Sequence, residues 1–228
     1  FMPTLVGIIA DRWINAERLY ALLHILYGAV LFYLPNTTDS GAFFYTMLVA
    51  MCFYMPTIAL CNSISYNILK SNNYDVIKEF PPIRVWGTIG FIVAMWTTNL
   101  TGQKATEGQF YIAGVAAILL GLYALTLPKC PPQKLIDKDA PLTHQLGLNA
   151  FRLFADYKMA LFFIFSMMLG AALQLTNAYG DVFLDEFKYF PKYASSFVIK
   201  YSTIIMSISQ ISETLFILAI PFFFKRFG

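Results

Sequence analysis

Apolar residues dominate long stretches of this chain, and polar and charged residues gather between those stretches. The apolar runs predict membrane spans at 1–10, 19–35, 42–66, 85–100, 109–127, 158–178 and 202–224. A helix that crosses a bilayer needs about 20 mostly apolar residues, because its backbone groups must bond within the segment. The runs show no alternation of apolar and polar positions, and they are too long for the strands of a membrane barrel. We therefore predict an all-α fold, a polytopic bundle of membrane helices.

The composition supports a lipid environment. Hydrophobic residues make up 58% of the 228 positions and charged residues 13%, which is more apolar surface than a soluble domain can bury. The net charge of +3 is scattered between apolar segments, so we expect the lipid bilayer as a partner and no nucleic acid. Cys52, Cys61 and Cys130 lack the spacing of metal ligands, and we interpret them as reduced packing residues. We expect no metal, no cofactor and no catalytic residue, since the chain has neither an H-E-x-x-H nor a G-x-S-x-G motif.

The loops predict which way the chain is oriented. Cytoplasmic loops of membrane proteins are enriched in Lys and Arg. In this chain most Lys and Arg residues lie in every second loop, starting with the loop after the first predicted span. The opposite loops hold only Lys104, Lys188, Lys192 and Lys200. Arg84, at the edge of a span, is left out of this comparison. The loops with the larger share are therefore predicted to lie inside.

The segment 128–157 is the one long connection. It is rich in proline and in charges of both signs, which is typical of a linker. We predict a cytoplasmic linker between residues 1–127, part of an N-terminal helical bundle, and residues 158–228, the start of a C-terminal bundle. Its later part, 146–157, fits either a short helix on the membrane surface or an ordinary loop.

Four polar residues on the last two predicted helices suggest a shared cavity. Glu213 lies near the middle of the span 202–224, where an ionisable group costs roughly 2.5–3.5 kcal/mol and is usually functional. Gln210 lies three residues earlier on the same face, and Gln174 and Asn177 repeat that spacing on the preceding helix. Amides can hydrogen-bond a base edge or a ribose. The alternatives are a structural carboxylate at Glu213 and amides that only join helices.

A second polar face lies in the span 85–100 and just before it. Pro81 and Pro82 predict a helix that begins after Pro82, and Arg84, Thr88 and Phe91 then share one face of it. Arginine can bond ligand oxygens, threonine adds a hydroxyl, and phenylalanine can stack on a flat base. Alternatively, Arg84 is a boundary charge whose side chain reaches the membrane surface, and Phe91 faces lipid.

Four segments of the chain carry a family resemblance. Residues 7–18, GIIADRWINAER, resemble the G-x-x-x-D-R loop between the second and third helices of the major facilitator superfamily, with Ile14 and Asn15 where glycine and arginine are usual. Residues 80–91 (FPPIRVWGTIGF), 162–170 (FFIFSMMLG) and 204–216 (IIMSISQISETLF) together resemble the bacterial nucleoside:proton symporter family within that superfamily. The resemblance implies a fragment holding about helices 2–8 of a major facilitator bundle of about 12.

The resemblance also implies a function. The protein is expected to be a multi-pass transporter of the bacterial inner membrane, not an enzyme, that takes up nucleosides with protons by alternating access, as a monomer. The implied substrate site comprises Arg84, Thr88, Phe91, Gln174, Asn177, Gln210 and Glu213, with Glu213 also coupling to protons. The implied cytoplasmic gate comprises Asp11, Arg12 and Arg18. The alternatives are a transporter for another polar solute, such as a sugar or drug, and a membrane receptor or enzyme.

Overall fold

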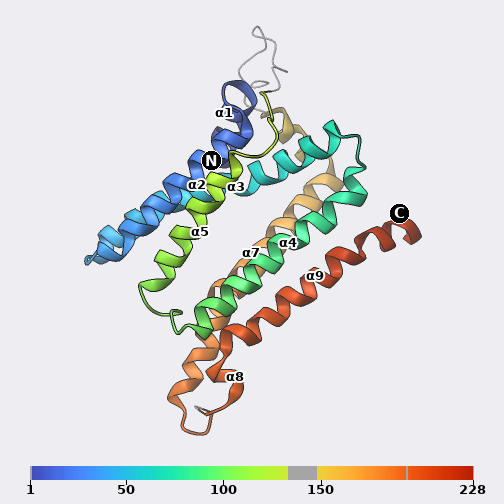
Figure 1. The fold of residues 1–228 in the computed structure, drawn as a ribbon. Coiled ribbons are helices and arrows are strands. Elements are labelled where there is room, and N and C mark those ends of the chain that lie inside the picture. Colours follow the sequence, from blue (N-terminus) through green and yellow to red (C-terminus); the bar gives the residue numbers. More distant parts are fainter. Residues whose placement is uncertain (1, 133–147, 194, 228) are drawn as a thin grey trace.

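A computed structural model describes residues 2–132, 148–193 and 195–227. The main helices are α1 (Met2–Arg12), α2 (Ala16–Tyr33), α3 (Ser40–Ser71), α4 (Val76–Leu100), α5 (Gly108–Ala124), α7 (Tyr157–Glu186), α8 (Phe197–Lys200) and α9 (Ser202–Phe227). Short 3₁₀ turns occur at η1 (Leu34–Asn36), η2 (Leu148–Ala155) and η3 (Phe187–Tyr189). The described part of the chain is helical with no strand, which confirms the predicted all-α fold (Figure 1).

The predicted linker 128–157 lies partly outside the described residues, because 133–147 are not among them. Its later part forms the 3₁₀ helix η2, which contacts α7. The ring centroids of Phe154 in η2 and Phe163 in α7 are 4.9 Å apart. A short helix is therefore present in the predicted place, and it is of the 3₁₀ type.

Aspartate side chains begin three of the long helices. Asp39 accepts a hydrogen bond from the Ala42 N–H at 2.9 Å before α3, and Asp156 accepts one from the Lys158 N–H at 2.8 Å before α7. These carboxylates satisfy backbone donors that the first turn of a helix leaves without partners.

The predicted start of α4 after Pro82 is wrong, because α4 already begins at Val76. Asp75 caps it, accepting from the Ile77 N–H at 3.0 Å. Pro81 and Pro82 therefore lie inside the helix, just past the first turn. Each proline lacks a backbone N–H and so removes one hydrogen bond from the helix. The hydrogen bond of the Asp75 cap and those of the long helix after Pro82 stabilise α4 despite the loss of these two bonds.

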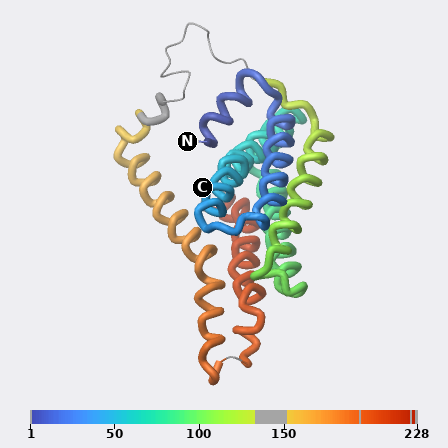
Figure 2. The backbone as a smooth tube through the Cα atoms, turned by 90° about the vertical axis from the view of Figure 1, so that its left-hand side faces the viewer, coloured from blue at the N-terminus to red at the C-terminus, as the bar shows by residue number. Residues whose placement is uncertain are grey.

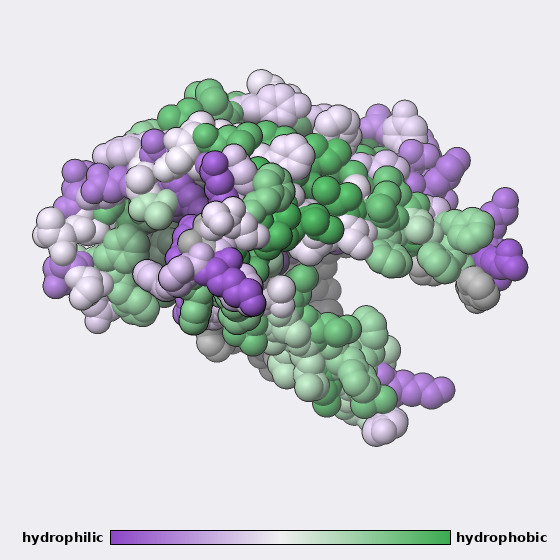
Figure 3. Space-filling model, turned by 90° about the horizontal axis from the view of Figure 1, so that it is seen from below, coloured by the Kyte–Doolittle hydropathy of each residue, from purple (hydrophilic) through white to green (hydrophobic). Residues whose placement is uncertain are grey.

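Several helices are long and apolar enough to cross a membrane. Among the described residues these are the segments Ala16–Asn36, Ser40–Ser71, Tyr157–Tyr189 and Ser202–Phe223, with the shorter apolar helix Gly108–Ala124 beside them. At about 1.5 Å per residue, the 32 residues of α3 exceed the thickness of the hydrocarbon core, about 30 Å. Many large hydrophobic side chains are exposed. In the view from below, Figure 3 shows hydrophobic residues on the helices, interrupted by more hydrophilic ones. Exposed apolar side chains are expected where helices contact lipid.

The first half of the chain packs around α2. Helix α2 contacts α5 and α3, and α1 contacts α3 (Figure 1). The α2–α5 contact is close because small residues face one another: a Cβ placed on Gly28 would lie 2.9 Å from the carbonyl oxygen of Gly114, and one on Gly121 would lie 3.0 Å from that of Ala21. Small residues are the usual means by which membrane helices approach closely.

Helix α4 contacts α3 of this group and packs more extensively along α9. This contact joins a helix of the first half to one of the second. Helix α7 has no buried residue. It lies beside α9 at the end where the two helices connect and diverges from it toward the other end (Figure 2).

Candidate functional site

The buried face of α9 is polar. Among its described residues, the buried ones are Ser202, Thr203, Ser207 and Gln210, with exposed fractions of 1%, 7%, 1% and 7%. Thr203, Ser207 and Gln210 follow the i, i+4, i+7 spacing of one helix face. A membrane helix that turns hydroxyls and an amide inward, and apolar side chains outward, is arranged around a polar interior rather than a hydrophobic core.

Helix α4 meets this polar face directly. The Trp96 indole N–H donates to the Ser207 hydroxyl at 3.0 Å, which fixes the register of α4 against α9. On α4, Thr88 is buried, with 3% of its surface exposed. The Arg84 guanidinium lies 3.5 Å from the Thr88 hydroxyl, so these two predicted site residues are neighbours. Phe91 is 48% exposed.

The structure also brings together predicted residues of α7 and α9. The Gln210 amide nitrogen lies 3.5 Å from the side-chain oxygen of Asn177, which is a long hydrogen bond between the two helices. Glu213 lies about one turn further along α9 and is half-buried, whereas Gln174, one turn before Asn177, is exposed. The two predicted polar pairs therefore contact each other through Gln210 and Asn177. Gln174 and Glu213 each lie about one turn away from this contact along their helices.

A cavity of about 310 Å³ adjoins Arg84. Its lining mixes aromatic, hydroxyl and amide side chains from α2, α3 and α4, and includes Tyr20, His24, Tyr54, Asn62 and Arg84. The His24 ring nitrogen Nδ1 lies 3.1 Å from the Tyr20 carbonyl oxygen, and the two rings are 4.3 Å apart. His24 is thus held by its own helix at the wall of the cavity.

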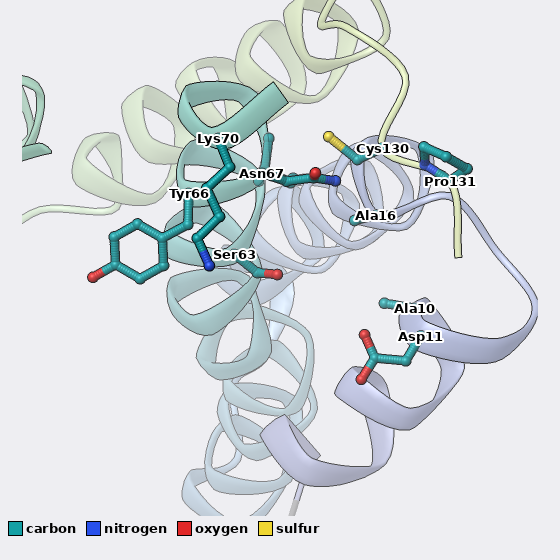
Figure 4. A pocket seen from close by; sticks show the side chains of 10 residues that line it. Ala10, Asp11, Ala16, Ser63, Tyr66, Asn67, Lys70, Cys130 and Pro131 are labelled. Carbon is teal, nitrogen blue, oxygen red and sulfur yellow. The ribbon is translucent and has the colours of Figure 1, made fainter. Parts of the chain in front are cut away.

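The predicted gate residues surround the turn between α1 and α2. Asp11 lines a second cavity, of about 240 Å³, opposite Ser63, Asn67 and Lys70 of α3 (Figure 4). The Arg12 guanidinium lies 6.0 Å from the centre of the Trp13 ring. Arg18 is exposed at the start of α2. The structure thus places charged side chains at this turn, and their role as a gate stays a prediction.

Sequence reasoning did not assign a role to Glu17, which has only 2% of its surface exposed. Its carboxylate accepts from the Cys130 backbone N–H at 2.9 Å and from the Asn15 amide at 3.0 Å. The Ala16 N–H in turn donates to the Cys130 carbonyl at 3.1 Å. Burial, together with the nearby Glu17 carboxylate, raises the pKa of the Cys130 thiol. Glu17 therefore ties the segment after α5 to the α1–α2 turn.

Sequence reasoning also missed the two buried hydroxyls that share a helix face with Gln210, those of Thr203 and Ser207. Their signal was present in the sequence as polar residues at helical spacing before Gln210, but serine and threonine are common in membrane helices and carry little weight alone. Within the described residues, no group of three or more His, Cys, Asp or Glu side chains is placed to hold a metal ion.

The chain is similar to known proteins in both sequence and structure. The profile of a family described as nucleoside H+ symporter matches residues 1–228. The chain is 52% identical over 229 residues to the xanthosine permease of Escherichia coli (strain K12) and 49% identical over 228 residues to the nucleoside permease NupG of the same organism. Each alignment includes 100% of this chain and 54% of the relative's sequence.

Solved structures agree with the sequence match. The chain is similar to a crystal structure of a point mutant of the nucleoside transporter NupG, with a TM-score of 0.85, 49% identity and coverage of 100% of this chain and 56% of that one. A second NupG crystal structure gives a TM-score of 0.79. The chain spans about half the length of the curated relatives it matches. The predicted fold, part of a transporter of the major facilitator type, is thereby confirmed.

Proposed function

We propose, from the premise that this chain belongs to the nucleoside H+ symporter family, that the whole protein takes up nucleosides together with protons by alternating access. The two relatives are permeases, not enzymes. The observation that carries the proposal is the polar seam of α9, where the Gln210 amide meets Asn177 of α7 and Ser207 meets Trp96 of α4. Hydroxyls and amides between membrane helices need hydrogen-bond partners, which can be groups of a neighbouring helix or a polar solute.

The substrate would bind along this seam. Gln210, Asn177 and Gln174 offer amide donors and acceptors of the kind that pair with a base edge or ribose hydroxyls. On the α4 side, Arg84 and Thr88 offer cationic and hydroxyl donors. Phe91 would stack on the base.

Proton coupling would fall to Glu213, the carboxyl group that stands about one turn beyond Gln210. A carboxyl group next to the solute can exchange a proton as the solute binds and leaves, which links the two movements. The cytoplasmic gate would comprise Asp11, Arg12 and Arg18. Residues 1–127 would belong to one bundle and 158–228 to the other, joined by the cytoplasmic linker 128–157.

The setting follows from the same premise. The whole protein would be a multi-pass protein of the bacterial inner membrane that works as a monomer in the lipid bilayer and does not bind nucleic acid. Its substrates would be nucleosides, so unlabelled xanthosine and uridine should compete with labelled uridine for uptake. Sugars should not compete; competition by a sugar alone would point instead to a transporter for another polar solute.

The role of Glu213 can be tested in the whole protein reconstituted in liposomes. We expect Glu213→Gln to abolish accumulation of labelled uridine driven by an inward proton gradient, because an amide cannot release a proton. Exchange of internal for external uridine should persist, since it needs no net proton movement. Glu186→Gln, which changes an exposed carboxyl group at the end of α7, is the matched control and should accumulate normally. Concentrative uptake by Glu213→Gln at the wild-type rate would refute the role.

A further inference from the structure

Lys104, in the loop between α4 and α5, has an unusually complete set of partners. Its ammonium nitrogen lies 2.8 Å from a carboxylate oxygen of Asp181 and 2.8 Å from one of Asp185. It also lies 2.7 Å from the Ser202 hydroxyl oxygen. A lysine ammonium has three N–H donors, so each donor has an acceptor at bonding distance.

The acceptors all come from the second half of the chain. Asp181 and Asp185 lie four residues apart on one face of α7, and Ser202 begins α9. The Ser202 hydroxyl donates to Asp185 at 2.8 Å, and the Thr203 hydroxyl donates to Asp181 at 3.1 Å. Each carboxylate is thus held both by α9 and by Lys104. Lys104 is the member of this cluster that comes from the first half.

The cluster lies at the end of the molecule predicted to face outside. Lys104 and Lys188 both belong to the lysine-poor loops of that side, and the α7–α9 connection lies at the same end as the α4–α5 loop (Figure 1). About one turn deeper along α9 from Thr203, Trp96 bonds the buried Ser207. The two halves are therefore tied together at the predicted outer end.

The strength of the tie suits a contact that opens repeatedly. The side chains of Lys104, Asp181 and Asp185 are 22%, 25% and 29% exposed, so water can replace the partners when they separate. Ion pairs that water reaches contribute little net stability each. A fully buried pair would be far more costly to break.

We infer that Lys104, Asp181 and Asp185 form the latch of the outer gate, closed in this structure and open when the transporter faces outside. The inference rests on the proposed alternating access, but it does not depend on which solute is carried. It assigns Lys104 a conformational role, distinct from the polar seam of α9. Lys188, which pairs with Asp185 at 2.9 Å from within the same segment of chain, does not join the two halves.

A thiol-labelling experiment on the whole protein tests the latch. Ser207→Cys places a reporter that is covered in the closed form, since Ser207 is 1% exposed, in a background where all native cysteines are replaced by serine. The variants are first shown to be folded and monodisperse and are then reconstituted in liposomes. Labelling with a membrane-impermeant maleimide from the outer side of the protein then measures how often the outer gate opens. We expect Lys104→Met to raise the labelling rate about fivefold, the order expected for losing a partly exposed network.

Matched variants separate the latch from a general effect of charge. Lys104→Arg should label close to the wild-type rate, because it keeps the cation. Lys188→Met removes a neighbouring cation that does not connect the two halves of the chain. It should therefore leave the labelling rate unchanged. If Lys104→Met does not fold, the double variant Asp181→Asn/Asp185→Asn should give the same acceleration.

Two results would overturn the latch. One is an unchanged labelling rate when either Lys104 or both aspartates are replaced. The other is equal acceleration by Lys188→Met. Labelling requires no transport, so a protein that fails to carry uridine would still report on the latch.

Discussion

The glycine contact between α2 and α5 makes a quantitative prediction about stability. A Cβ on Gly28 would lie 2.7 Å from Cγ1 of Ile118 and 2.9 Å from the carbonyl oxygen of Gly114. The first neighbour is a side chain that can move, but the second is backbone, so α2 and α5 must separate to admit even one methyl group. Gly28→Ala therefore perturbs the packing of the first half without changing charge or polarity.

The size of the effect follows from two opposing terms. Overpacking of a well-packed contact costs about 1–3 kcal/mol. Alanine in place of glycine within a helix recovers roughly 0.5–1 kcal/mol. We expect a net loss of about 1–2 kcal/mol, or a fall of roughly 2–6 °C in the melting temperature. Gly28→Leu should cost more, because its larger side chain meets the same backbone.

The assay is the thermal unfolding of the detergent-solubilised whole protein, followed by the loss of monodisperse material. Gly90→Ala is the matched control: Gly90 lies in α4, and a Cβ there meets nothing within 4 Å in the described structure. We expect it to unfold at or slightly above the wild-type temperature. Equal melting temperatures for Gly28→Ala and Gly90→Ala would refute the close approach of α2 and α5.

Two further predictions concern buried polar contacts. Glu17→Ala should speed maleimide labelling of Cys130 about tenfold. It removes the hydrogen bond that the Cys130 N–H donates to the carboxylate, and it removes a carboxylate that raises the pKa of the thiol. An unchanged rate would show that Glu17 does not hold this segment in place. Trp96→Phe should lower stability by about 0.6–1 kcal/mol by removing the bond between α4 and α9. Ser207→Ala should cost about as much, and the double variant no more than either; additive losses in thermal unfolding would count against the bond.

Much of the helical architecture could be predicted from long apolar runs in the sequence. Such a run must form a helix in the membrane, because its backbone N–H and C=O groups can bond only within the segment. The boundaries were harder. Pro81 and Pro82 suggested a helix start, but the cap by Asp75 moves it to Val76. The α3 helix runs past its predicted end at 66 to Ser71, because helices continue beyond the hydrocarbon region where hydropathy no longer marks them.

In the candidate site, too, some features could be predicted from the sequence and others could not. Single polar residues within apolar spans, such as Gln210 and Asn177, stand out in a sequence, and the structure places these two side by side. Contacts between distant segments do not stand out. Lys104 looks like an ordinary loop lysine until α7 and α9 bring Asp181 and Asp185 to it, and nothing local in the sequence encodes that meeting.

The most direct test of the proposed transport is uptake of labelled uridine by the whole protein in liposomes, with and without an inward proton gradient. Nucleoside:proton symport predicts that uridine accumulates above its external concentration only when the gradient is present, and that a protonophore collapses the accumulation. Uptake that merely equilibrates and ignores the gradient, from protein shown to be folded, would contradict it.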